Sequence, residues 1–205
     1  MTKRIFLALL VLTLAAGGAF AQVSLGAGGN FAVSWDSMKV DRDGDITESL
    51  ITTSGGGFYA FLDATYLEVD VGMLFGSLKM KISEEGASSE ADGPNVSYLT
   101  LGLFGKYPID LGGFTLFPML GIQLDVGLSA EQNGVKAESE ALNELSRLWI
   151  KFGVGADFNL SEQLYLRPSI LYGLNFNTKS FENLRGDATS FNHGLDIRVA
   201  LGFRF

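Results

Sequence analysis

Apolar and polar side chains alternate residue by residue along most of the chain after residue 22. Within 114–129, the even-numbered residues from Phe114 to Leu128 are all apolar, and most odd-numbered residues between them are polar or glycine. A period of two places successive side chains on opposite faces of a β-strand. The pattern predicts eight strands. They cover residues 23–36, 58–62, 67–82, 98–107, 114–129, 147–160, 164–176 and 192–205.

The segment 67–82 departs from simple alternation. Its apolar residues change from odd to even positions after Phe75. One extra residue in a strand turns every later side chain to the opposite face, so we predict a β-bulge near Gly76-Ser77. Pro118 and Pro168 lie inside two other segments, where proline cannot donate a ladder hydrogen bond.

The connections between the segments alternate in length. Long polar loops are expected at 37–55, 83–95, 130–146 and 178–191, and short turns at 63–66, 108–113 and 161–163. In an antiparallel meander, all the long loops then share one end. Most segments have 10 to 15 residues, which suits the ~9–11 residues of a tilted bilayer-spanning strand. These features predict an all-β fold, an eight-stranded antiparallel up-and-down transmembrane barrel.

A soluble eight-stranded barrel with its apolar face inward would show the same alternation. The interior of such a barrel is just wide enough for side chains to fill. The polar faces are rich in small residues and fit that interior, whereas the Leu, Ile and Phe of the apolar faces would overfill it. We therefore favour an apolar face toward lipid. Aromatic residues near the strand ends match interfacial girdles: Tyr66, Tyr107, Phe114, Phe158, Tyr172, Phe176, Phe203 and Phe205.

The first 21 residues have the features of a cleavable signal peptide. Lys3 and Arg4 form a basic region, an apolar run covers 5–14, and Ala19-Phe20-Ala21 is a small-x-small cleavage site. An uncleaved N-terminal anchor is the alternative. No later stretch approaches the ~18 apolar residues of a membrane helix. We expect residues 22–205 to form one barrel domain after export.

Composition narrows the functional classes. The chain has 47% hydrophobic residues, 26 Gly and no Cys, which excludes disulfide scaffolds, iron–sulfur proteins and thiolate zinc sites. The formal charge is −8, and loss of residues 1–21 removes two positive charges and makes it −10. Nucleic-acid binding needs clustered Lys and Arg, so we expect no nucleic-acid partner.

The last strand carries a family resemblance. Residues 193–205 read HGLDIRVALGFRF, with alternating apolar residues and a final Phe. This resembles the C-terminal signature of bacterial outer-membrane proteins, and the whole chain resembles the small OmpA/OmpX/OmpW-type barrels. The resemblance implies the outer membrane of a diderm bacterium. It also implies that Phe203 and Phe205 form a signal for the barrel-assembly machinery.

The face opposite the apolar one predicts a charged lumen. It holds five acids and six bases: Glu68, Asp70, Asp125, Asp157 and Asp196 with Lys106, Arg147, Lys151, Arg167, Arg198 and Arg204. In a narrow lumen such charges must pair, because an unpaired one costs several kcal/mol. An ion-pair network that closes the barrel is one interpretation, and a polar pore for small ions or solutes is the other.

Catalysis, cofactors and metals have little support in the sequence. His193 is the only His, and the Gly-Leu that follows it departs from the His-x-Ser pair of the lipid A deacylase barrels. The acidic run 41–45 has Gly44 at its fourth position, whereas an EF-hand loop needs Gly at the sixth. We therefore expect no catalytic residue, no cofactor and no metal site.

The sequence thus leads to a functional expectation with one alternative. We expect a non-enzymatic, monomeric outer-membrane barrel with a plugged lumen and acidic surface loops, which contacts membrane lipid and an unknown extracellular ligand. The alternative is a narrow porin-like channel for small ions or solutes.

Overall fold

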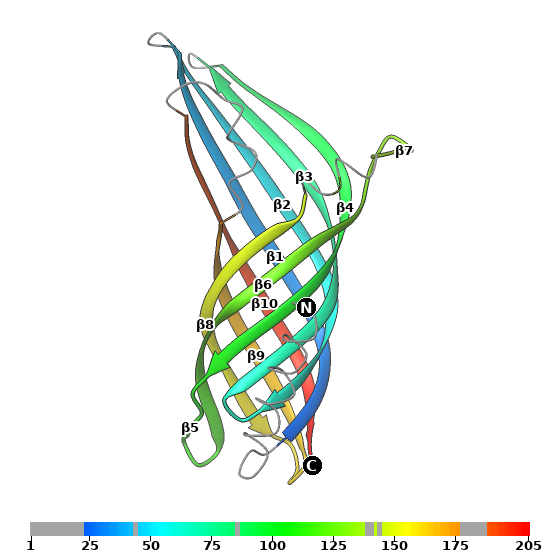
Figure 1. Ribbon diagram of the computed structural model, residues 1–205, viewed down its shortest axis with the longest axis vertical. Coiled ribbons are helices and arrows are strands. Elements are labelled where there is room, and N and C mark those ends of the chain that lie inside the picture. The colour runs from blue at the N-terminus through cyan, green and yellow to red at the C-terminus, as the bar shows by residue number, and fades with distance from the viewer. Residues whose placement is uncertain (1–22, 43–44, 85–86, 138–141, 143–144, 177–187) are drawn as a thin grey trace, which may run out of the picture.

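A computed structural model shows a barrel of long tilted strands (Figure 1) and describes all residues except 1–22, 43–44, 85–86, 138–141, 143–144 and 177–187. The expected signal peptide lies outside the described residues. The eight long strands are β1 (Val23–Arg42), β2 (Asp45–Ala64), β3 (Leu67–Glu84), β4 (Ala87–Lys106), β6 (Phe114–Gln132), β8 (Arg147–Asn159), β9 (Leu164–Asn175) and β10 (Ala188–Arg204). Two short strands are β5 (Ile109–Asp110) and β7 (Val135–Lys136). No helix in the described part of the chain is long and apolar enough to cross a membrane.

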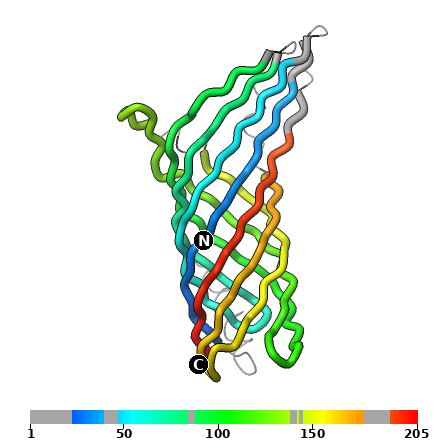
Figure 2. Tube along the Cα trace, turned by 180° about the vertical axis from the view of Figure 1, so that it is seen from behind, coloured from blue at the N-terminus to red at the C-terminus, as the bar shows by residue number. Residues whose placement is uncertain are grey.

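The long strands close into an antiparallel ring. Their order is β4-β3-β2-β1-β10-β9-β8-β6, and β4 also pairs with β6. The first and last strands join, since Ser24 of β1 lies opposite Arg204 of β10 and opposite Asp63 of β2. Figure 2 shows this seam from behind, with β1 and β10 side by side. The predicted eight-stranded antiparallel barrel is confirmed.

The outer wall of the barrel is apolar and the inner wall carries the buried polar groups. On β6, Leu120 and Ile122 are 60% and 48% exposed, whereas the intervening Gly121 is half-buried and Gln123 is buried. The other long strands show the same alternation within the barrel. Because a lipid-exposed wall must be apolar, this outer face suits a bilayer.

Four strands continue well past the rest of the barrel wall, as Figure 1 shows for β1 to β4. We call this part the strand extension; it comprises residues 37–42, 45–50, 81–84 and 87–90, which pair with one another. The prediction of long loops at 37–55 and 83–95 is therefore wrong, because only 43–44 and 85–86 lie between strands there.

Two cross-strand ion pairs accompany the pairing of these polar strands. Lys39 lies opposite Glu48, and Lys81 lies opposite Glu90, with nitrogen–oxygen distances of 3.1 and 3.7 Å. Directly opposed residues of unlike charge favour pairing of antiparallel strands. None of the described side chains of the extension is buried, so water reaches both faces there and the sequence lacks the apolar alternation that marks a barrel wall.

The other two expected loops are only partly described. Residues 130–146 contain the end of β6, a turn at Asn133-Gly134 in which both residues have positive φ, and β7. Of 178–191, residues 188–191 belong to β10 and the rest lie outside the described residues.

The prediction of a bulge in β3 is wrong. β3 pairs with β2 in unbroken register over its whole length. The register shift occurs between β3 and β4, where Ser77 pairs with Asn95 but Lys79 pairs with Asp92. The extra residue therefore lies in β4.

Two leucines explain the change of apolar pattern in β3. Leu74 and Leu78 pack against a buried cluster of Val96, Tyr98 and Ala130. The inner wall thus becomes apolar at this height, while the strand itself stays regular.

Pro118 and Pro168 lie where the ladder is incomplete. Pro168 occupies a gap in the β8–β9 ladder, which has partners at Ser169 and Leu166 but none between. Pro118 lies one residue beyond Met119, where the β4–β6 pairing ends. The missing N–H of proline therefore removes little from the sheet.

Candidate functional site: the charged lumen

Nine of the eleven charged residues expected in the lumen are buried: Glu68, Asp70, Lys106, Asp125, Lys151, Asp157, Arg167, Asp196 and Arg198. Arg147 and Arg204 are half-buried. Most of these side chains meet in two layers. The lower layer, near the short turns, contains Asp63, Glu68, Lys106, Asp157 and Arg167. The upper layer contains Asp70, Gln123, Lys151, Asp196 and Arg198.

Arg167 holds the lower layer together by binding three carboxylates. Its Nε and Nη2 donate to the two oxygens of Asp157 at 2.6 and 2.8 Å. Its Nη1 donates to Glu68 Oε2 and its Nη2 to Asp63 Oδ2, both at 2.6 Å. Lys106 binds the same Asp63 oxygen. These side chains come from β2, β3, β4, β8 and β9, so the layer spans the lumen.

Arg198 has the corresponding place in the upper layer. Its Nη1 donates to Asp70 Oδ2 at 2.6 Å, its Nε to Asp196 Oδ2 at 2.8 Å, and its Nη2 to Gln123 Oε1 at 2.7 Å. Lys151 Nζ donates to Asp196 Oδ2 and to Gln123 Oε1, both at 2.9 Å. This layer joins β3, β6, β8 and β10.

Aromatic rings pack on both arginines. Arg167 lies over Phe61, Phe117 and Tyr165 at 4.7, 4.9 and 5.0 Å, and Arg198 over Tyr59 and Phe104 at 5.1 and 5.4 Å. All five rings are buried. A desolvated guanidinium over an aromatic face gains cation–π energy, and the rings fill space that water would otherwise occupy.

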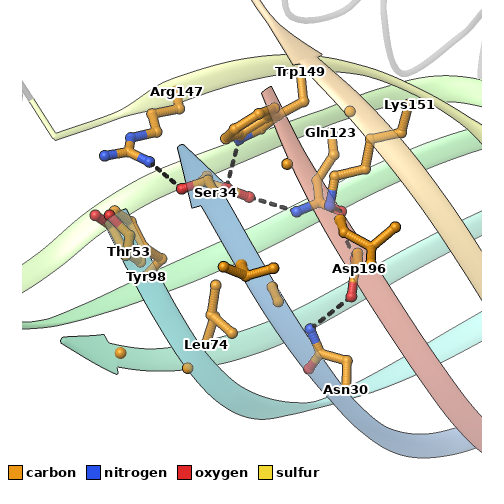
Figure 3. A pocket seen from close by; sticks show the side chains of 18 residues that line it. Asn30, Ser34, Thr53, Leu74, Tyr98, Gln123, Arg147, Trp149, Lys151 and Asp196 are labelled. Atoms are coloured by element: carbon orange, nitrogen blue, oxygen red, sulfur yellow. Dashed lines mark hydrogen bonds and ion pairs between the residues drawn. The ribbon is translucent and has the colours of Figure 1, made fainter. Parts of the chain in front are cut away.

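Asp125 lies beside the upper layer and has neutral partners. Gln123 Nε2 donates to its Oδ1 at 2.6 Å, and Trp149 Nε1 donates to its Oδ2 at 2.7 Å. Figure 3 shows Gln123 and Trp149 at a small cavity that Asp125 also lines. Arg147 lines the same cavity but contacts Asp36, at 3.3 Å, and Ser34 instead.

The cavity has a volume of about 40 Å³, which is room for about three water molecules. Thr53 and Tyr98 also line it, and their side chains are buried. Neither hydroxyl oxygen has a hydrogen-bond partner among the described residues. The cavity therefore presents two unpaired hydroxyl groups, beside apolar side chains such as Leu74 and Leu195.

The set of lumen residues expected from the sequence lacks Asp63, Asp36 and Gln123. The pattern predicts a short turn at Asp63, but β2 continues to Ala64 and keeps the Asp63 side chain buried. Asp63 lies two residues after Phe61, so alternation places both side chains on the same face of the strand. That face also carries Tyr59, and its aromatic character hides the fact that it is the inner face. Gln123 was on the expected inner face but carries no charge.

His193 lies in an aromatic cluster that faces away from the lumen. Its ring centroid is 5.2 Å from that of Trp35, 5.7 Å from Tyr172 and 5.0 Å from Phe191. No group of three His, Asp or Glu that could hold a metal ion occurs among the described residues. The acidic run 41–45 lies partly outside them.

Phe203 and Phe205 project from the outer wall at the end of β10. They are 40% and 76% exposed, and their rings contact edge to face at 5.4 Å. Their recognition by the assembly machinery stays a prediction.

Comparison with known proteins supports the assignment of the fold. No curated protein matches the sequence. The outer membrane protein OprG from Pseudomonas aeruginosa is similar in structure, with a TM-score of 0.52, 12% identity, and coverage of 90% of this chain and 97% of OprG. Neisserial surface protein A gives a TM-score of 0.43, 10% identity, and coverage of 88% of this chain and 99% of that protein. A model of the outer membrane protein beta-barrel domain matches residues 6–205. The chain therefore belongs to the outer membrane protein beta-barrel family and is a protein of the Gram-negative outer membrane.

Proposed function

We propose that this protein is a non-enzymatic barrel whose lumen is closed and whose strand extension serves envelope structure or binding at the cell surface. The observation that supports the closed lumen is the pair of charged layers, each built on one arginine. Opening the lower layer would separate Arg167 from three buried carboxylates. Each uncompensated buried charge costs several kcal/mol, so the closed arrangement is strongly favoured.

The strand extension supports a role outside the membrane. Lys39, Glu48, Lys81 and Glu90 are all well exposed, and mixed surface charge of this kind favours water over lipid. The extension lies at the end of the barrel opposite the short turns (Figure 1). In barrels of this class the long connections face the cell exterior. An extracellular ligand, so far unidentified, is the partner that we expect there.

Single-channel recording in a planar bilayer tests the closed lumen. Folded wild-type protein, checked by its heat-dependent gel mobility, should give no reproducible conductance steps. The variant Arg198→Ala removes the centre of the upper layer. Conductance steps in this variant alone would show the leakage of a weakened plug. Steps in the wild-type protein that change with Arg147→Ala or Asp125→Ala would contradict the closed lumen.

A narrow channel for small ions is the second candidate, and the charged side chains Asp125, Arg147 and Lys151 around the cavity favour it. Ions that reach this cavity would still meet both charged layers. The same recordings distinguish the two functions, because only a channel gives steps in the wild-type protein.

Labelling of single cysteines tests the position of the extension. The chain has no Cys, so Glu48→Cys introduces one reactive thiol. A membrane-impermeant maleimide should label it on intact cells. Tyr66→Cys in a short turn, 61% exposed, should react only after the outer membrane is permeabilised. The reverse result would contradict a role of the extension at the cell surface.

A further inference from the structure

The charges on the inner wall do not balance. Among the described residues this wall carries seven carboxylates and six cationic side chains: Asp36, Asp63, Glu68, Asp70, Asp125, Asp157 and Asp196 with Lys106, Arg147, Lys151, Arg167, Arg198 and Arg204. Six of the seven carboxylates have an ion pair within 4 Å. Asp125 has none among the described residues, and its charge is the unbalanced one.

Asp125 is well inside the barrel, with only 6% of its surface exposed. Both of its oxygens accept a hydrogen bond, from Gln123 and from Trp149, which are neutral donors. Lys151 and Arg147 line the same cavity, but their ion pairs are with Asp196 and Asp36. Lys151 and Arg147 attract the Asp125 carboxylate from farther away, but a buried carboxylate without a direct counterion is costly, so a further cation beside Asp125 would stabilise it.

The cavity at Asp125 provides the space and the ligands for such a charge. Thr53 and Tyr98 line it with buried hydroxyl oxygens that have no hydrogen-bond partner among the described residues. Tyr98 is positioned by β4, next to β6: its pair in β6 is Gly127, two residues from Asp125. Figure 3 shows Thr53 and Tyr98 on the same side of the cavity as Arg147. Oxygen ligands of this kind suit hard cations.

We propose that this cavity binds one monovalent metal cation, of the sodium or potassium class, against the carboxylate of Asp125. One carboxylate supplies one negative charge, which a monovalent cation balances. A divalent cation would leave the lumen with an excess of positive charge, and it is ordinarily held by several carboxylates. The proposed site goes beyond the proposed function, since a closed barrel and a channel could each contain it.

Thallium(I), a monovalent cation with strong anomalous scattering, tests the site directly. Crystals of the detergent-purified protein soaked in a thallium(I) salt should show an anomalous peak in the cavity, in contact with Asp125. The peak should vanish in Asp125→Asn and remain in Asp110→Asn, which changes an exposed carboxylate in the β4–β6 connection. No peak in the wild-type protein would overturn the proposal and would leave bound water or a proton on Asp125.

Unfolding in solution provides an independent test. Urea titrations in sodium chloride and in N-methyl-D-glucamine chloride, at equal ionic strength, compare a cation that fits the cavity with one that does not. Near saturation, a tenfold rise in sodium should lower the unfolding equilibrium constant about tenfold. Tyr98→Phe keeps the ring and removes one ligand, so it should weaken this response even if Asp125→Asn fails to fold. Equal unfolding in both salts would overturn the proposal.

Discussion

Arg167 and Asp157 form a bidentate pair inside the barrel, with Nε–Oδ1 and Nη2–Oδ2 distances of 2.6 and 2.8 Å. The same guanidinium also binds Glu68 and Asp63, from the opposite part of the barrel wall. One side chain thereby forms ion pairs with carboxylates of three other strands. The lower layer depends on Arg167 more than on any single carboxylate. Arg167 pairs with three carboxylates, whereas each carboxylate pairs with at most two cations.

The variant Arg167→Met should therefore destabilise the barrel strongly. It keeps much of the side-chain volume but leaves buried carboxylates uncompensated, and breaking a buried pair in this way costs about 3–5 kcal/mol. Urea unfolding of the protein in lipid vesicles, followed by tryptophan fluorescence, measures the loss. Arg204→Met is the matched control. Arg204 is only half-buried and lies 3.5 Å from Asp157, so a loss as large as that of Arg167→Met would contradict the central role of Arg167.

Gly202 should not tolerate a side chain. A Cβ atom there would overlap the ring of Tyr165, which is fully buried and hydrogen-bonded to Ser24 at 2.8 Å. Overpacking of this kind costs about 1–3 kcal/mol, and displacement of the ring would also break the hydrogen bond. Gly202→Val should thus slow folding and lower the urea midpoint.

Gly105→Val is the control for this substitution. Gly105 is exposed on the outer wall, and its Cβ would meet only a carbonyl oxygen at 3.7 Å. Valine suits a strand, so this variant should fold as well as the wild-type protein. Equal falls in the urea midpoints of Gly202→Val and Gly105→Val would show that the overlap with Tyr165 in the lumen is not the cause of the destabilisation.

The sequence predicts the faces of the barrel wall because the wall separates lipid from a polar interior. Where that contrast holds, as in residues 114–129, each side chain can be assigned to one face. The contrast fails in the strand extension, where water reaches both faces, and near Leu74 and Leu78, where the inner wall is apolar. The predictions of long loops at 37–55 and 83–95 and of a bulge in β3 fail at these places.

The layers themselves could not be predicted from the sequence. Alternation assigns Arg167 and Glu68 to the same interior but does not give their heights along the barrel axis. Those heights depend on strand tilt and register, which the closed ring fixes collectively. Asp125 likewise was expected in an ion pair, and only the structure shows it with the neutral donors Gln123 and Trp149.

The ion pair between Lys39 and Glu48 should contribute little to stability. Both side chains are more than half exposed, and exposed pairs contribute about 0.2–1 kcal/mol, less at high salt. A double-mutant cycle with Lys39→Ala and Glu48→Ala, read from urea midpoints, should give a coupling energy in that range. A coupling of several kcal/mol would mean that the extension is far less hydrated than its exposed surface indicates.

A charged residue on the lipid-facing outer wall should destabilise the barrel, most strongly at the bilayer midplane. Val199 lies on the outer wall near the middle of the barrel part of β10 and is 49% exposed. Arginine at the bilayer midplane of a barrel costs about 2–4 kcal/mol, falling toward the interfaces. Val199→Arg should show such a loss in vesicles.

Val135→Arg is the matched control for that loss. Val135 is 72% exposed on β7, at the far end of the barrel from the short turns. The same substitution should change the free energy of unfolding by less than about 0.5 kcal/mol there, as at an ordinary surface position. Because both variants replace valine with arginine, the difference between them measures the membrane environment alone. Equal effects would contradict the assignment of the outer wall of β10 to lipid.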